Sequence, residues 1–432
     1  MNFCEFLKSY EKEYIMRRVV VTGYGAVSCA GNSVAELWSS MVEGRCGLGP
    51  VTKFDTTEYR TKIAGEVRNF DITKYMSAKD AKRLDMFCQY AIAAGDEAML
   101  SAGLALDPAE RGIDDSRFGV LVSTGIGGLI VIADQQDTLR TRGPGRISPL
   151  AIPMMIGDSA PGCLSIRYGA KGPNFSLMSA CATGCHSIGE AWWMIRRNDA
   201  DVMLAGGTEE SVMEICLAGF SAMKAMSQRN DDPLHASRPF DLNRDGFVAS
   251  EGSGVLVLEE LEHARRRGAK ILAEVVGYGA TGDAFHITSP DPEGRGDAKA
   301  IRVAMDHAGI KPEDIDYINA HGTSTHLNDL YETKAIKLAL GEAAARKVSV
   351  SSTKGVTGHA LGAAGGLECI ACVKAIENSI VPPTINYETP DPECDLDVTP
   401  NVAVKRDIRY AINNNLGFGG HNAAVIFKRY ED

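Results

Sequence analysis

The chain has 432 residues, of which 44% are hydrophobic and 23% charged; this ordinary globular composition excludes a fibrous or disordered protein. Its formal net charge of -11 argues against a general binder of nucleic acid or anionic membranes, because such proteins neutralise phosphates with Lys and Arg. Eleven scattered cysteines do not form the dense pattern of a small secreted disulfide scaffold, so we expect a protein of the reducing cytoplasm.

No membrane span or secretory signal is expected. No stretch of the sequence reaches the roughly 18 apolar residues that a membrane-spanning helix needs. Residues 1–15 mix acidic and basic side chains and lack the apolar run of a secretory signal. We interpret them as an N-terminal extension and exclude them from the fold.

The remaining chain alternates short β-branched runs with helical stretches. In chain order, the predicted elements are a strand at 19–22, helices at 34–43 and 78–102, strands at 119–123 and 173–178, a helix at 184–197, strands at 202–205 and 254–259, a helix at 296–308, a strand at 316–319, a helix at 330–340 and a strand at 348–352. This alternation predicts a largely parallel sheet covered by helices.

A short repeat is consistent with two related halves. Val-Thr-Gly-Tyr-Gly-Ala at 21–26 returns as Val-Val-Gly-Tyr-Gly-Ala at 275–280. A polar, basic stretch at 261–270 lies between the two copies. We therefore divide the chain into the extension 1–15, an N-terminal half 16–268 and a C-terminal half 269–432.

The segment Ser179-Ala-Cys-Ala-Thr-Gly184 places Cys181 between a predicted strand and a predicted helix. A thiol at such a turn lies near unpaired N–H groups and the positive end of the helix dipole, which favours the thiolate and attack on an acyl group. A cysteine taken alone is more often a small buried core residue. Cys181 by itself therefore does not establish a catalytic site.

Two further loops change this balance. Asn319-Ala-His-Gly-Thr-Ser-Thr325 and Lys354-Gly-Val-Thr-Gly-His359 each place a histidine in a turn rich in Gly and Thr, directly after a predicted strand. One such histidine is more often structural than functional. Two such histidines together with Cys181 form a Cys/His/His constellation, and a single candidate catalytic site explains all three residues.

These segments, with Gly417-Phe-Gly-Gly-His-Asn422, resemble the β-ketoacyl-[acyl carrier protein] synthases of the thiolase superfamily, and most closely the type II elongating group. The resemblance extends from about residue 17 to residue 428 and also includes the motifs Ser237-Arg-Pro-Phe-Asp241, Arg244-Asp-Gly-Phe247, Asp283-Ala-Phe-His-Ile-Thr-Ser-Pro290 and Val381-Pro-Pro-Thr-Ile-Asn386. It implies a thiolase-like α/β fold in which two similar halves form five layers, α-β-α-β-α, usually as a homodimer. The N-terminal half would carry the nucleophile and the C-terminal half both histidines.

The resemblance also implies a reaction. Cys181 would take an acyl group from acyl carrier protein; malonyl-carrier would then lose carbon dioxide, and its carbanion would attack the Cys181 thioester and lengthen the fatty acid by two carbons. The backbone N–H groups of Cys181 and Phe418 would form the oxyanion hole, and the side chains of His321 and His359 would hold the malonyl thioester oxygen. No cofactor is required for this chemistry.

Further site residues follow from the same resemblance. Lys354 would join Asp329 and Glu332 in a charged network that supports the histidines, and Phe418 would gate the acyl group. The predicted substrate-binding residues are Ile126 in the acyl tunnel, Thr323 and Thr325 on the pantetheine arm, and Thr288 and Ser289. The predicted carrier-binding residues are Lys79, Lys82, Arg83, Arg146 and Lys224, and those for a structural monovalent or magnesium ion are Asn319, Glu368 and Asn413.

Three alternatives stay open at this point. A polyketide or specialised-lipid synthase of the same fold would share every catalytic residue. A non-catalytic partner subunit that measures chain length would lack the nucleophile, so Cys181 and the two histidines argue against it. A thiolase would need a second cysteine near the C-terminus, where this chain has Phe418.

Overall fold

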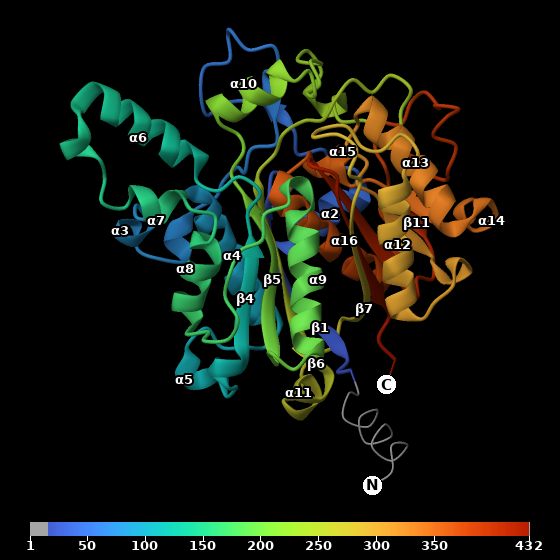
Figure 1. Cartoon of the computed structure of the whole chain (residues 1–432), viewed down its shortest axis with the longest axis horizontal. Helices are drawn as coiled ribbons and strands as arrows, with labels where there is room; N and C mark the ends of the chain where they lie inside the picture. Colours follow the sequence, from blue (N-terminus) through green and yellow to red (C-terminus); the bar gives the residue numbers. More distant parts are fainter. Residues whose placement is uncertain (1–15, 432) are drawn as a thin grey trace.

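A computed structural model describes residues 16–431 (Figure 1); the extension predicted at 1–15 lies outside the described residues. One nine-stranded sheet runs through the molecule. Its strands stand in the order β4 (Phe118–Ser123), β5 (Val202–Glu209), β6 (Gly252–Glu260), β1 (Val19–Ser28), β7 (Ala273–Gly282), β13 (His421–Lys428), β12 (Tyr410–Gly417), β8 (Tyr317–Asn319) and β9 (Ser349–Ser351). A short antiparallel pairing of β1 with β7 joins its two parts.

The two parts of the sheet have the same topology. In the first part β4 and β5 are parallel, and β6 and β1 follow antiparallel. In the second part β9, β8 and β12 are parallel, and β13 and β7 follow antiparallel. A parallel bridge between Val120 and Asn174 places the segment before Cys181 beside β4, where β9 lies in the second part. This segment, predicted as a strand at 173–178, forms only that one bridge.

The prediction of a largely parallel sheet is wrong, because each part of the sheet is mixed. The hairpin between β12 and β13 shows the physical reason. Its strands are joined by Phe418, Gly419 and Gly420 alone, and a connection this short can only join antiparallel neighbours.

The repeated Gly-Tyr-Gly sequences lie on β1 and β7, the first strand of each half. A Cβ at Gly23 or Gly25 would meet backbone oxygens of α4 (Met86–Ser101) at 2.3 and 1.9 Å. A Cβ at Gly277 or Gly279 would meet backbone oxygens of α12 (Arg295–Ala308) at 2.1 and 1.9 Å. The same close packing of helix on strand therefore occurs twice, and it confirms that the two halves are related.

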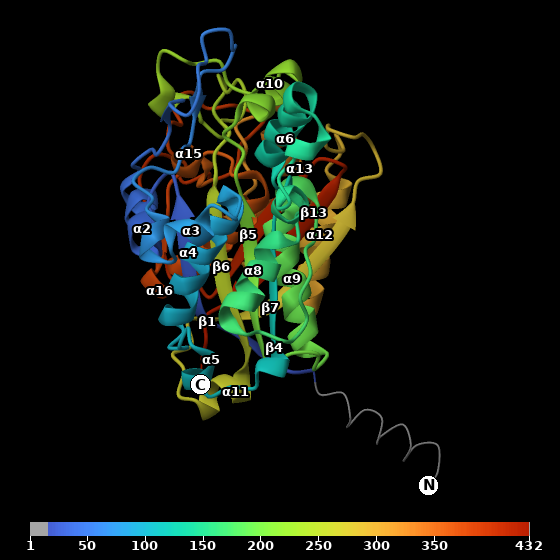
Figure 2. The ribbon, with the colours of Figure 1, turned by 90° about the vertical axis from the view of Figure 1, so that its left-hand side faces the viewer.

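The helices complete the five layers that the resemblance implied (Figures 1 and 2). The outer layers are α4 with α8 (Ser159–Tyr168) on one side and α12 with α13 (His326–Leu340) on the other, and the central layer is α9 (Thr183–Arg196) with α16 (Ala364–Asn378). One buried apolar cluster surrounds the central helices, and two more lie beneath the outer layers. The central layer thus belongs to both halves of the sheet.

The other elements cover the ends and edges of this core. The helices are α2 (Val34–Glu43), α3 (Ala78–Ala81), α5 (Pro108–Arg111), α6 (Leu129–Arg142), α7 (Ala151–Met155), α10 (Glu214–Ala222), α11 (Leu261–Arg266), α14 (Glu342–Ala345) and α15 (Lys354–Thr357), and the short strand pairs are β2 (Gly49–Pro50) with β3 (Ile63–Ala64) and β10 (Ile380–Val381) with β11 (Val404–Lys405). Among the helices of residues 16–431, none combines the length and apolar character of a membrane-spanning segment.

Candidate active site

Three chain segments bring the predicted catalytic residues together. Cys181 lies in the turn that begins α9, His321 follows β8, and His359 follows α15 and precedes α16. The sulfur and one nitrogen of each imidazole all lie within 4.8 Å of one another. Since α9 and α16 are the two central helices, the fold itself brings Cys181 and His359 together at the boundary between the halves.

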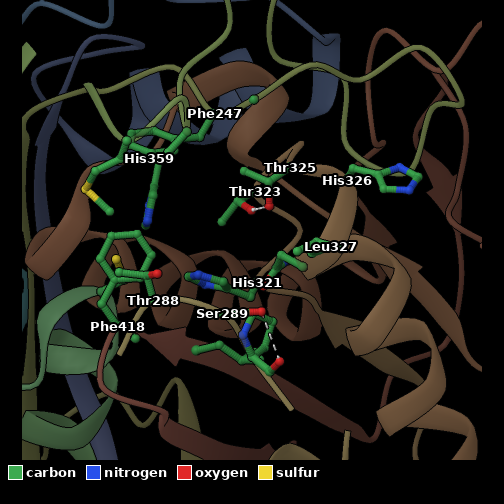
Figure 3. A pocket seen from close by; sticks show the side chains of 18 of the residues that line it. Phe247, Thr288, Ser289, His321, Thr323, Thr325, His326, Leu327, His359 and Phe418 are labelled. Atoms are coloured by element: carbon green, nitrogen blue, oxygen red, sulfur yellow. Dashed lines mark hydrogen bonds between the residues drawn. The ribbon is translucent and has the colours of Figure 1, made fainter. Parts of the chain in front are cut away.

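A pocket opens above these three residues, and Phe418 also lines it (Figure 3). The two imidazole rings are nearly perpendicular, with centroids 5.2 Å apart, and both point into the space beside Phe418. Cys181, His321 and His359 are all buried in the free protein. A thioester placed in this pocket would therefore reach the sulfur and both imidazoles at once.

The surroundings of His321 determine which of its ring nitrogens carries hydrogen. Its Nδ1 faces two donors, Lys354 Nζ at 3.4 Å and Asn415 Nδ2 at 3.3 Å. Nδ1 must therefore accept, so the neutral ring carries its hydrogen on Nε2. Although a Cys/His/His group of these dimensions could in principle hold zinc, this tautomer presents an N–H donor to the pocket instead of a lone pair.

Both histidines predicted as catalytic are neutral at physiological pH. Burial, followed by the positive charge of Lys354, lowers the pKa of His321 and of His359 well below the ordinary value of 6.5. Glu332 fixes the His321 loop from behind, because its carboxylate accepts the backbone N–H groups of His321 at 2.7 Å and Gly322 at 2.8 Å. The site thus holds neutral N–H donors in a fixed position.

The charged network behind the histidines differs from the predicted one. Lys354 is buried and pairs with Glu368, not with Asp329 or Glu332. Asp329 instead faces the buried Arg244, with 3.5 Å between its Oδ2 and the arginine Nε. Each acid therefore supports a separate element, because Asp329 and Glu332 lie on α13 whereas Glu368 lies on α16.

Replacing Lys354 with Met is expected to destabilise the protein by about 3–5 kcal/mol, because it leaves the Glu368 carboxylate buried without its partner. Urea unfolding of this variant and of a control variant measures the free energy of unfolding. Lys270→Met is the matched control, since Lys270 is 77% exposed and its pair with Glu377 is 3.5 Å long; we expect a change below about 1 kcal/mol there. Equal effects in the two variants would contradict a structural role for the buried pair.

The expected thiolate at Cys181 is not supported. Burial raises the pKa of the Cys181 thiol to about 12, although Lys354 and the backbone N–H groups of Phe418 and Cys181 act in the opposite direction. Desolvation outweighs these favourable contacts because Cys181 is buried at the base of the pocket. Cys181, the predicted nucleophile, therefore rests as a thiol, held close to the two N–H groups predicted as the oxyanion hole.

The predicted substrate-binding residues divide into two groups. Thr323, Thr325, Thr288 and Ser289 all line the pocket (Figure 3), and the hydroxyl oxygens of Thr323 and Thr325 are 2.9 Å apart. Ile126 does not line it; this residue lies on the loop after β4, behind the nucleophile turn. Four of the five predicted substrate-binding residues therefore share one pocket, whereas Ile126 does not line it.

The five predicted carrier-binding residues are all exposed. Lys79, Lys82 and Arg83 share one turn at α3, and Arg146 follows α6. Lys224, directly after α10, is the one member of this set that lines the pocket. The basic residues therefore extend from the pocket rim to distant surface and do not form one cluster around the entrance.

The predicted ion-binding residues fit a monovalent cation only in part. Asn319 and Asn413 pair across β8 and β12, and both have a buried Oδ1 without a hydrogen-bond partner in the described part of the chain. Glu368, however, is already engaged by Lys354 and by Asn415 Nδ2 at 2.6 Å. The amide oxygens suit a weakly held monovalent ion, whereas a magnesium ion would need a free carboxylate.

Sequence reasoning missed Asn415, which contacts both His321 and Glu368. Asn415 lies two residues before the C-terminal motif Gly417-Phe-Gly-Gly-His-Asn422, so it was close to a recognised segment but outside it. It was missed because a strand residue contributes to a site through the direction of its side chain, which the motif alone does not give.

A duplicated five-layer fold with a buried thiol and two imidazoles at the boundary between its halves is the arrangement of thiolase-like condensing enzymes. Family models for the N-terminal and C-terminal domains of β-ketoacyl synthase match residues 16–264 and 272–388. The chain belongs to the β-ketoacyl synthase family and is an acyltransferase of the condensing type.

Curated relatives agree with this assignment. The chain is 50% identical over 415 residues to 3-oxoacyl-[acyl-carrier-protein] synthase 2 of Synechocystis sp. and 52% identical over 415 residues to the protein of that name from Staphylococcus aureus. Each alignment covers 96% of this chain and 99% of the relative.

Solved structures show the same fold. A β-ketoacyl synthase from Burkholderia phymatum matches with a TM-score of 0.89 at 33% identity over 96% of this chain and 100% of that one. A type II polyketide ketosynthase, AntDE, solved with its acyl-carrier protein AntF and a bound hexaketide, matches with a TM-score of 0.88 at 35% identity over the same shares.

Proposed function

We propose that this chain elongates fatty acids as a 3-oxoacyl-[acyl carrier protein] synthase, with Cys181 as acyl carrier and His321 and His359 as donors to the enolate. The observation that carries this proposal is the meeting of one thiol and two neutral imidazoles within 4.8 Å in one pocket. The curated relatives' name supports the same substrate class.

In the first half-reaction the Cys181 sulfur attacks the thioester carbonyl of acyl-carrier. A new sulfur–carbon bond forms, the pantetheine sulfur leaves, and the proton of the Cys181 thiol passes to that leaving sulfur. The N–H groups of Cys181 and Phe418 stabilise the oxyanion between these steps, a contribution of roughly 3–4 kcal/mol where one such donor has been removed. Because the thiol begins protonated, no net proton is released.

In the second half-reaction malonyl-carrier loses carbon dioxide. The electron pair of the broken carbon–carbon bond becomes an enolate, whose oxygen accepts hydrogen bonds from His321 Nε2–H and from His359. The enolate carbon then attacks the Cys181 thioester, a carbon–carbon bond forms, and the Cys181 sulfur leaves as a thiolate. One proton from solvent then restores the resting thiol. These steps need no redox cofactor, and we infer that an ion held by Asn319 and Asn413 would be structural.

The proposal is tested by supplying the protein with hexanoyl-carrier and malonyl-carrier and analysing the products by mass spectrometry. The expected product is a 3-oxooctanoyl-carrier, formed with one carbon dioxide per turnover. A folded protein that neither loads Cys181 nor releases carbon dioxide would make the non-catalytic partner subunit the better interpretation. Extension of one chain through several rounds without reduction would favour a polyketide synthase.

We also propose that the protein acts in the cytoplasm as a homodimer. Helix α6 projects from the body (Figure 1) and none of its residues is buried. The exposed large apolar residues of this region are Ile130, Ile132, Leu139, Ile152, Ile156, Ile166, Phe175 and Met178. A surface this apolar suits a second copy of the chain, so light scattering is expected to give twice the chain mass of 46.3 kDa. A monomeric mass at micromolar concentration would overturn this part of the proposal.

A further inference from the structure

A buried acid outside the predicted site, Glu209, connects two of its loops. Glu209 ends β5 and is fully buried. Its carboxylate accepts hydrogen bonds from the Thr124 hydroxyl and from the backbone N–H groups of Gly125 at 2.9 Å and Ile126 at 3.3 Å. It also accepts the backbone N–H of Gly362 at 2.9 Å. One carboxylate therefore holds the loop after β4 and the turn that follows His359.

The bonding of Glu209 is unusual for a buried acid. Within residues 16–431 it takes part in no ion pair, whereas its neighbour Glu210 lies 3.3 Å from Lys53 Nζ. Burial raises the pKa of Glu209 to about 7 even though its hydrogen bonds act in the opposite direction. Since this carboxylate accepts from the Thr124 hydroxyl and from three backbone N–H groups, it fixes the positions of the neighbouring loops.

The segments held by Glu209 lie against the nucleophile. A Cβ at Gly125 would come within 3.1 Å of the Ala180 carbonyl oxygen, and one at Gly362 within 2.4 Å of the Gly125 nitrogen. A Cβ at Gly207 would come within 2.0 Å of the Gly362 carbonyl oxygen. Glycine is therefore required where the loop after β4, the turn of Cys181 and the turn after His359 touch.

Two of these turns also contain strained backbone. Ala180, directly before Cys181, has φ of +51°, and Leu361, two residues after His359, has φ of +46°. A residue with a side chain adopts this left-handed conformation at a cost of roughly 1–2 kcal/mol, so the surrounding contacts must maintain it. The contacts of Gly125 with Ala180 and of Gly362 with Glu209 are placed to do this.

We propose that Glu209 is a positioning residue of the condensing site: through the backbone N–H groups of Gly125 and Gly362 it fixes the Cys181 turn relative to the His359 turn. The inference rests on the proposed function, and Glu209 itself touches no substrate in it. A second effect follows from its charge. After burial, Glu209 is among the groups that raise the pKa of the Cys181 thiol, so it helps to keep the resting nucleophile protonated.

The test compares Glu209→Gln with Glu210→Gln. The two acids are adjacent and buried, and burial raises the pKa of each to about 7, but only Glu209 contacts the catalytic loops. For Glu209→Gln we expect kcat of condensation to fall about tenfold or more, because small displacements of reacting groups are costly. KM for the acyl-carrier should change less than about twofold, because its docking surface is unaltered.

The effect of the Glu209 charge on Cys181 is measured by the rate at which iodoacetamide alkylates Cys181 at pH 8, followed on the peptide that contains Cys181. Glu209→Gln should react about threefold faster, because a lower pKa of Cys181 increases the thiolate fraction more than it decreases nucleophilicity. Glu210→Gln should stay within about twofold of wild type in every assay. Wild-type kcat and alkylation in Glu209→Gln, or equal losses in the two variants, would overturn the proposal.

Thr124→Val decides the question if Glu209→Gln does not fold. It removes one neutral donor and leaves the charge, so kcat should fall about threefold while Cys181 alkylation stays unchanged; wild-type kcat in this variant would then refute the positioning role. Failure of the proposed function looks different, because in that case the wild-type protein itself would form no 3-oxoacyl product.

Discussion

Cys181→Ala is expected to take up no acyl group from acyl-carrier and to lose condensation by at least about 10³-fold, because removal of a covalent nucleophile leaves only binding and the oxyanion hole. Intact-protein mass spectrometry checks this directly: the wild-type protein should gain the mass of one acyl group and the variant none. Decarboxylation of malonyl-carrier should persist in the variant, since that step uses the two histidines and not the sulfur.

Cys185→Ala is the matched control for this result. Cys185 lies four residues after Cys181, in the first turn of α9, and is also buried, but its sulfur faces the Ala423 carbonyl oxygen at 3.7 Å and does not line the pocket. This variant should load as wild type does. An acyl adduct that survives in Cys181→Ala would place the nucleophile elsewhere and contradict the proposed mechanism.

The sequence predicted those elements whose signals are local. The helix at 34–43 agrees with α2 residue for residue, because Ser33 caps its first turn and Gly44 ends it in the left-handed conformation. The helix predicted at 78–102 is broken into α3 and α4, and Asp85 starts the second piece by accepting the Phe87 N–H at 3.3 Å. Asp85 is a typical N-cap residue, but the helical pattern continues on both sides of it, so the sequence predicted a single helix.

Strand direction could not be predicted, because an apolar run has the same composition in a parallel and in an antiparallel pair. For the site, the motifs located the sulfur and both imidazoles correctly in one pocket. They did not give the partner of Lys354, because Glu368 lies in a stretch that reads as an apolar core helix. They also did not give the protonation state of Cys181, which depends on burial and therefore on the whole fold.

His321→Ala and His359→Ala are expected to load acyl groups on Cys181 but to release carbon dioxide from malonyl-carrier about 10²–10³-fold more slowly, the cost of losing one hydrogen-bond donor to a developing oxyanion. Single-turnover loading and carbon dioxide release, measured on the same preparations, separate the two half-reactions. His307→Ala is the control, since His307 lies on α12 outside the pocket, with its Nδ1 2.6 Å from the Tyr278 carbonyl oxygen. Normal carbon dioxide release in either catalytic variant would contradict its role.

His321 and His359 are expected to stay neutral when the pH is lowered. A buried imidazole beside Lys354 binds a proton less readily than a free one, so lowering the pH from 8 to 6 should leave His321 and His359 neutral. In nuclear magnetic resonance spectra, each imidazole signal is identified by its absence from the corresponding alanine variant. Neither signal should move over this pH range, whereas an unperturbed histidine titrates near pH 6.5. Titration of either signal near 6.5 would mean that the site donates from an imidazolium. The neutral state matters because a second positive charge beside Lys354 would have to be neutralised within the same buried network, and Glu368, the acid paired with Lys354, is already engaged.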